Sequence, residues 1–207
     1  DTVDASVLDV AVRTLTRTIA ECRAMGHEVE VIEPSQFKTI AAPTYPEIRL
    51  ALGAEEEIRE RLRAFEPEAV HIATEGPIGI ATRRICVEWK LPFTTSYHTR
   101  FPEYVSARLP VPLAAGYAYM KWFHKPSGRM MVATDTMREE LERHGFRNIS
   151  AWSRGVDTDI FCPPTGSDVG LVWSSQPHDH RAMRESCLEW AFVCRSDTSR
   201  CSRRNKP

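Results

Sequence analysis

Long apolar segments are missing from this sequence of 207 residues. No run approaches the roughly 20 apolar residues that a helix needs to cross a bilayer. The first residues show neither the basic nor the apolar part of a signal peptide, so we expect a cytoplasmic protein. The formal net charge is -1 at pH 7. This balance gives no electrostatic reason to expect a nucleic acid as a partner.

Closely spaced cysteine pairs are also missing. Cys22 and Cys86 fall at apolar positions of predicted helices, where we expect small buried hydrophobic side chains. The residue types that suit zinc gather towards the C-terminus: His178, His180, Cys187, Cys194 and Cys201. Since they lack any Cys-x2-Cys spacing, a metal site there is only a weak alternative.

Short apolar strands alternate with amphipathic helices through most of the chain. Val12, Leu15 and Ile19 repeat at helical spacing, and Gly26 ends that helix. Strands are predicted at 29–32, 69–73, 93–96, 129–133 and 148–152, with helices at 54–65, 80–90, 113–124 and 137–144. Three prolines indicate a loop over residues 33–46. This alternation predicts an α/β fold with a doubly wound, mostly parallel sheet, which is a Rossmann-like architecture.

The pattern changes after Pro164. Residues 165–207 show no alternation of strand and helix, and they hold three of the six cysteines together with many arginines. We therefore expect one α/β domain over residues 1–164 and an aberrant, disordered tail over residues 165–207.

Polar segments follow the predicted strands. Glu75 and Gly76 follow one strand, Tyr97 to Arg100 follow the next, and Arg154 follows the last. Because the carboxyl ends of parallel strands share one edge of a sheet, we expect these segments to converge on a ligand. His98 could bind a sugar hydroxyl or transfer a proton. An ordinary turn with a solvated Glu75, and a structural histidine beside a surface arginine, remain open as alternatives.

Two further features have structural interpretations. His71 lies inside a predicted strand, which favours a hydrogen-bonded core histidine. Tyr117, Tyr119, Trp122 and Phe123 lie on one predicted helix, where packing is the usual role of such residues. Contact with a lipid surface is the alternative for this helix, since basic residues flank the aromatic ones.

Longer motifs occur in order along the chain: 14–29, 43–50, 71–79, 96–104 and 153–158. Over roughly residues 10–164, they resemble the N-terminal domain of family-4 glycosyltransferases, which have the two-domain GT-B fold. The subgroup with the greatest similarity contains bacterial GDP-mannose-dependent α-mannosyltransferases and sulfoquinovosyl-diacylglycerol synthase-like enzymes.

This resemblance implies a retaining transfer of a hexosyl group, mannosyl in the first place, from a nucleotide sugar to an acceptor hydroxyl. GDP-mannose or a UDP-sugar would be the donor substrate, and a lipid or glycan would be the acceptor, with no cofactor and no metal. A lipid acceptor would bring peripheral contact with the inner face of the cell membrane. The resemblance makes His98 the catalytic residue. It assigns substrate contacts to Glu75, Gly76, Tyr97, Thr99, Arg100 and Arg154.

The sequence departs from this family at both ends. The family begins with a strand and a glycine-containing turn near the donor phosphate, whereas this chain has no glycine before Gly26 and carries Asp9 in that region. The family's donor-binding half would follow Pro164, where the tail stands instead. We therefore expect an incomplete enzyme, with a non-catalytic acceptor-binding fragment or a truncated pseudogene product as the alternative. A nucleotide-sugar epimerase is disfavoured because Gly-x-Gly-x-x-Gly is absent.

Overall fold

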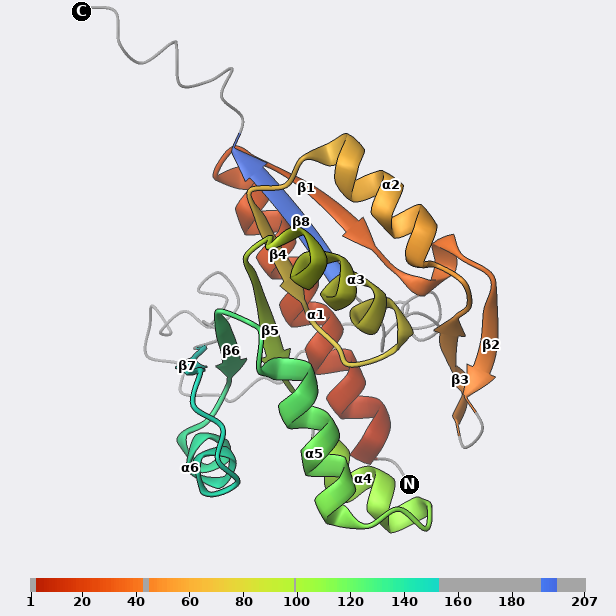
Figure 1. The fold of residues 1–207 in the computed structure, drawn as a ribbon, viewed down its shortest axis with the longest axis vertical. Helices are drawn as coiled ribbons and strands as arrows, with labels where there is room; N and C mark the ends of the chain where they lie inside the picture. The colour runs from red at the N-terminus through yellow and green to blue at the C-terminus, as the bar shows by residue number, and fades with distance from the viewer. Residues whose placement is uncertain (1–2, 43–44, 99, 153–190, 197–207) are drawn as a thin grey trace, which may run out of the picture.

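A six-stranded sheet forms the centre of the protein (Figure 1). The computed structural model describes residues 3–42, 45–98, 100–152 and 191–196. The strand order is β1-β8-β4-β5-β6-β7. The strands are β1 (His27–Ile32), β4 (Ala69–Ile72), β5 (Phe93–Tyr97), β6 (Arg129–Val132), β7 (Ile149–Ala151) and β8 (Ala191–Ser196).

Most of this sheet is parallel. The pairs β4–β5, β5–β6 and β6–β7 are parallel, while β8 pairs antiparallel with both β1 and β4. Since β1 and β4 both oppose β8, β1 runs in the same direction as the four parallel strands. The predicted Rossmann-like α/β fold is therefore confirmed.

Helices cover both faces of the sheet (Figure 1). The helix α1 (Val3–Ala24) packs Leu15 and Ile19 on one face, against Ala73 and Phe192. The helices α2 (Glu55–Phe65) and α3 (Pro77–Trp89) bury their apolar sides on the other face. The remaining helices are α4 (Phe101–Arg108), α5 (Leu113–His124) and α6 (Asp135–Arg143). Within the described residues, no helix is both long and apolar enough to cross a membrane.

The predicted loop over residues 33–46 is wrong in part. A short 3₁₀ helix, η1 (Pro34–Gln36), is followed by an antiparallel hairpin of β2 (Thr39–Ala42) and β3 (Tyr45–Ala51). The three prolines of this segment predict a loop. Yet Pro46 lies in a two-stranded sheet, where both strands are edge strands that tolerate proline.

The expected tail without regular structure is wrong for residues 191–196. These residues form β8, which lies inside the central sheet between β1 and β4. Ala191 and Val193 are buried with the α2–α3 core, whereas Phe192 is buried on the α1 side. Three consecutive apolar residues suit a strand that is covered on both faces. The remainder of the tail lies outside the described residues.

Strand β8 also relates to the strand with which the family begins, ahead of the first helix. Asp9 and its neighbours lie in α1, so the described residues hold no strand ahead of that helix. The position between β1 and β4 is nevertheless occupied, because β8 pairs along the whole of β1 and of β4. The sheet is therefore completed by a segment from the opposite end of the sequence.

A charged side chain within β8 tests this arrangement. Val193 is 1% exposed, so Val193→Asp buries a carboxylate and should lower the free energy of unfolding by about 3 kcal/mol or more. Val87→Asp makes the same change on α3, where the side chain is 47% exposed. This control should cost less than about 1 kcal/mol. Equal urea midpoints for the two variants would contradict the position of β8.

Candidate functional site

The carboxyl ends of β4, β5, β6 and β7 lie along one edge of the sheet, because these strands are parallel neighbours. Glu75 and Gly76 follow β4, Tyr97 ends β5, and His98 comes next. Trp152 follows β7. We take this edge as the candidate site, since ligands of such sheets bind beyond the carboxyl ends of the strands.

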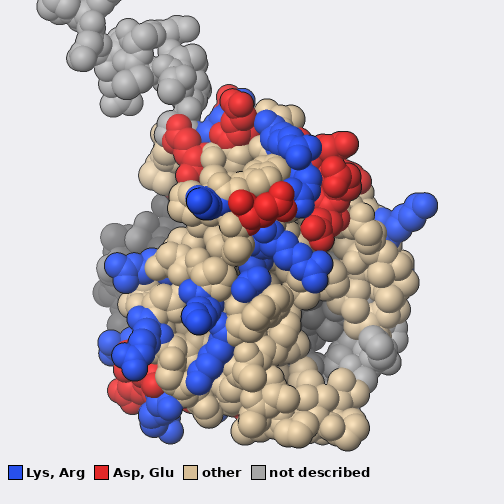
Figure 2. Space-filling model, in the orientation of Figure 1, with Lys and Arg blue, Asp and Glu red and all other residues tan. Residues whose placement is uncertain are grey.

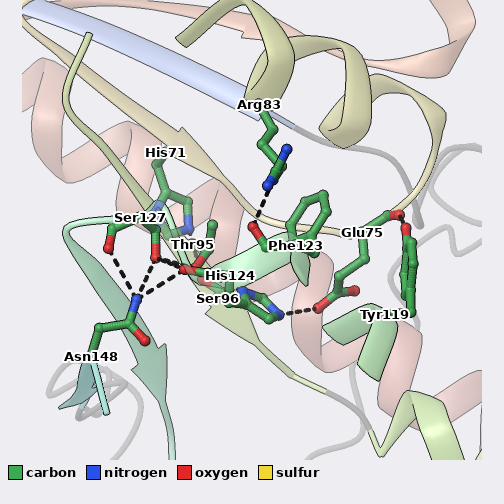
Figure 3. A network of polar contacts seen from close by, with 10 residues as sticks. All are labelled: His71, Glu75, Arg83, Thr95, Ser96, Tyr119, Phe123, His124, Ser127 and Asn148. Atoms are coloured by element: carbon green, nitrogen blue, oxygen red, sulfur yellow. Dashed lines mark hydrogen bonds and ion pairs between the residues drawn. The ribbon is translucent and has the colours of Figure 1, made fainter. Parts of the chain in front are cut away.

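Glu75 is held from two sides (Figure 3). The Tyr119 hydroxyl donates a hydrogen bond to the Glu75 carbonyl oxygen, with an O···O distance of 2.5 Å. His124 Nε2 lies 3.3 Å from Glu75 Oε1, and the Glu75 side chain is only 12% exposed. The alternative of a solvated Glu75 is therefore wrong.

Glycine is required where α3 meets this loop. A Cβ atom on Gly79 would lie 2.0 Å from the Thr74 carbonyl oxygen, a backbone atom that cannot rotate away. Gly76 is the N-cap residue of α3, and its carbonyl accepts the Ile80 amide. The first turn of α3 therefore lies directly against the segment that carries Glu75, a close approach that only glycine permits at position 79.

His71 lies on the α1 side of β4. Its Nδ1 is 2.8 Å from Thr94 Oγ1 and its Nε2 is 2.7 Å from Ser96 Oγ. Both hydroxyls come from β5, where alternate residues point to the same face. Burial, followed by the nearby His98, lowers the pKa of His71 to about 3. The predicted hydrogen-bonded core histidine is confirmed.

The other face of β5 carries a second buried network (Figure 3). Thr95 Oγ1 is 2.8 Å from His124 Nδ1 and 3.2 Å from Ser127 Oγ. Asn148, just before β7, donates its side-chain amide to Ser127 Oγ over 2.8 Å. This network connects the centre of the sheet to His124 and thus to Glu75.

His98 and Tyr97 lie next to these networks. The His98 ring centroid is 5.4 Å from that of Trp152, which is itself 6.0 Å from His71. Tyr97 is 2% exposed. Burial raises the pKa of its hydroxyl far above the usual value, and the charges of Glu103 and Glu75 add to this. Tyr97 therefore lies near Glu75, and His98 lies near Trp152. We call these four residues, which all lie at the carboxyl edge of the sheet, the cluster.

Arg100 contacts α6. Its guanidinium forms an ion pair of 2.7 Å with Glu140 on α6, and its side chain is 53% exposed. Thr99 and Arg154, two of the predicted contacts, lie outside the described residues. So do the proposed zinc ligands other than Cys194, which lies in β8.

Sequence reasoning missed three residues of the site. Tyr119 and His124 were interpreted as packing or lipid-contacting residues, although both contact Glu75 from α5. The two residues lie five positions apart on one helix. Nothing in this spacing indicates that both contact Glu75, which lies 44 or more positions earlier in the sequence. Trp152 had a weak signal, since it is the last residue of the strand predicted over 148–152, at the same edge of the sheet.

The buried His71 makes stability depend on pH. Its pKa is about 3 in the folded chain and 6.5 at its ordinary value. The neutral form is therefore favoured by folding. The contribution is fully present above about pH 6.5 and is lost as the pH falls towards 3, at up to about 1.4 kcal/mol per pH unit.

We expect His71→Gln to flatten the fall in unfolding free energy between pH 6.5 and 5, as measured by urea denaturation. The matched control is His27→Gln, at the half-exposed start of β1. This control should keep the slope of the unmodified chain. An unchanged slope in His71→Gln would contradict the assignment.

Known proteins resemble this chain over most of its length. The family model for Glycosyltransferase Family 4 matches residues 11–160. A GDP-mannose-dependent alpha-mannosyltransferase of Mycobacterium tuberculosis is 23% identical over 174 residues, which are 75% of this chain and 46% of that protein. Proteins of the same name from Corynebacterium glutamicum and Mycolicibacterium smegmatis are 26% and 25% identical.

The alignment with the Corynebacterium protein covers 72% of this chain and 40% of that protein, and the Mycolicibacterium alignment covers 78% and 48%. The chain thus spans less than half the length of these relatives. No solved structure matches the chain.

Proposed function

Because this chain belongs to glycosyltransferase family 4, we propose that it is the acceptor-side half of a retaining transferase. The reaction moves a mannosyl group from GDP-mannose to a hydroxyl of a lipid or glycan. The observation that carries this proposal is the cluster of Glu75, Tyr97, His98 and Trp152 at the carboxyl ends of the strands. The names of three relatives support mannose as the sugar and GDP as the nucleotide.

The cluster has the chemistry of a sugar-binding surface. A carboxylate such as Glu75 accepts hydrogen bonds from sugar hydroxyls, and the ring of Trp152 offers a flat apolar wall. His98 lies against that wall, with a ring spacing of 5.4 Å. We assign it the contact with the transferred sugar. Retaining transfer depends on stabilising charge on the leaving diphosphate, which we assign to the donor-side half.

A lipid acceptor agrees with the surface of the α4–α5 hairpin. Leu109, Leu113 and Trp122 are more than 40% exposed there. Figure 2 shows an uncharged surface over the end of this hairpin, whereas acidic residues gather over α2. The guanidinium of Arg83 lies 4.0 Å from the Trp122 ring. We infer that the protein works at the inner face of the cell membrane, in peripheral contact with lipid.

A second candidate is a non-catalytic acceptor-binding fragment. It is favoured by the coverage of the relatives, since the chain corresponds to 40–48% of their length. The two candidates differ in one property. A fragment binds an acceptor sugar without turnover, whereas the acceptor-side half of an enzyme completes turnover once a donor-side half is supplied.

The test measures nucleoside diphosphate release from GDP-mannose and from UDP-glucose, with a lipid extract as the acceptor. The purified chain should release none. The whole chain, which keeps β8 in the sheet, fused at its C-terminus to the donor-side half of the Mycolicibacterium smegmatis relative should release GDP. In the fusion, His98→Ala should lower turnover by about 100-fold or more, because a group at the reacting centre is lost.

His27→Ala is the control, because His27 lies at the amino end of β1, on the opposite edge of the sheet. Equal turnover by His98→Ala and His27→Ala would remove His98 from the mechanism. GDP release by the unfused chain would mean that its own residues complete the cleft.

A further inference from the structure

A second buried histidine lies beside the cluster without a role in the function proposed above. His124, the last residue of α5, is 0% exposed. One ring nitrogen faces Thr95 on β5 and the other faces Glu75 in the loop after β4. The hydrogen bonds around it determine where its protons lie.

The Ser127 hydroxyl has a fixed acceptor. Its Oγ lies 2.7 Å from the His124 carbonyl oxygen. A carbonyl oxygen only accepts hydrogen bonds, so Ser127 must donate its single hydroxyl hydrogen there. Asn148 Nδ2 donates to the same Ser127 oxygen over 2.8 Å. Ser127 therefore has no hydrogen left for Thr95.

The Thr95 hydroxyl is the next group in this network. Its Oγ1 is 3.2 Å from Ser127 Oγ, and Thr95 must be the donor of that bond. With its hydrogen used, Thr95 can only accept from His124 Nδ1 across 2.8 Å. The Nδ1 atom of His124 therefore carries a proton.

The other ring nitrogen of His124 is Nε2. His124 Nε2 is buried, and Glu75 Oε1, at 3.3 Å, is its polar neighbour. If Nε2 and the carboxylate were both without a proton, two lone pairs would face each other in a buried place. A proton between them removes this repulsion and converts the contact into an ion pair.

Two helices determine which side keeps that proton. Glu75 comes directly before Gly76, the N-cap residue of α3, and the positive end of a helix stabilises a carboxylate. His124 lies at the C-terminal end of α5, where the negative end of a helix stabilises a cation. The hydroxyls of Tyr97 and Tyr119 face this pair from β5 and α5. Tyr119 donates its hydrogen to the Glu75 carbonyl oxygen, and burial raises the pKa of Tyr97 far above its usual value, so that hydroxyl is uncharged at neutral pH.

We propose that His124 is a positively charged positioning residue that holds the Glu75 carboxylate for binding of the acceptor hydroxyl. Oε1 faces the imidazolium, which leaves Oε2 for the acceptor. The functional part rests on the function proposed above, whereas the protonation state does not. His124 acts through Glu75 and touches no reacting atom itself.

The protonation state is measured in the whole chain by NMR of histidine side chains labelled with ¹⁵N. At pH 7, both His124 ring nitrogens should carry protons, and this signal is assigned by its disappearance in His124→Gln. In Glu75→Gln, Nε2 should lose its proton while Nδ1 keeps its own. Glu88→Gln, which removes a surface partner of Arg59, should change nothing. An unprotonated Nε2 in the unmodified chain overturns the proposal without any need for a variant.

The functional part is tested in the fused enzyme. His124→Leu should raise the KM for the lipid acceptor by about tenfold or more and leave the KM for GDP-mannose unchanged, because only one charge-assisted contact is lost. His124→Gln keeps an N–H donor towards Glu75 and should recover part of this loss. Equal effects of Leu and Gln, or an effect on the donor KM alone, would overturn the positioning role. Doubly protonated His124 in a fusion that transfers no sugar would refute the proposed function and leave the charge assignment standing.

Discussion

Strand β5 carries three hydroxyl side chains through the middle of the sheet, and the fold depends on a buried partner for each of them. Thr94 and Ser96 hold His71 on one face. Thr95 contacts His124 and Ser127 on the other face. A buried hydroxyl without a partner costs about 1–3 kcal/mol. These partners therefore fix β4, α5 and the segment before β7 relative to β5, and with them the loops that carry the candidate site.

Hydrophobic periodicity predicts one part of the sheet and not another. Strands that alternate with amphipathic helices predict the parallel part correctly, because the apolar residues of β4 and β6 lie next to clear helix patterns. The position of β8 could not be predicted. A strand of six residues from a distant part of the chain carries no local signal for its partners, and pairing with β1 and β4 is a tertiary property.

The candidate site was predictable to a similar degree. Glu75, Tyr97 and His98 follow from the rule that polar residues after parallel strands lie at one edge of the sheet, and the structure places all three at that edge. Arg100 follows the same rule, and its guanidinium pairs with Glu140 of α6 at 2.7 Å, a contact that the rule does not predict. His124 could not be predicted, because its partners on β5 and after β4 are defined only by the folded arrangement of α5.

We propose that the loops after β4, β5 and β7 form a surface for sugar hydroxyls, and the assignment of the function depends on it. The most direct measurement is an amide NMR titration of the chain with methyl α-mannoside. We expect the perturbed amides to gather at residues 74–79, 97–98 and 152. Perturbations at the opposite edge, around residues 27 and 69, or none at saturating sugar, would contradict it.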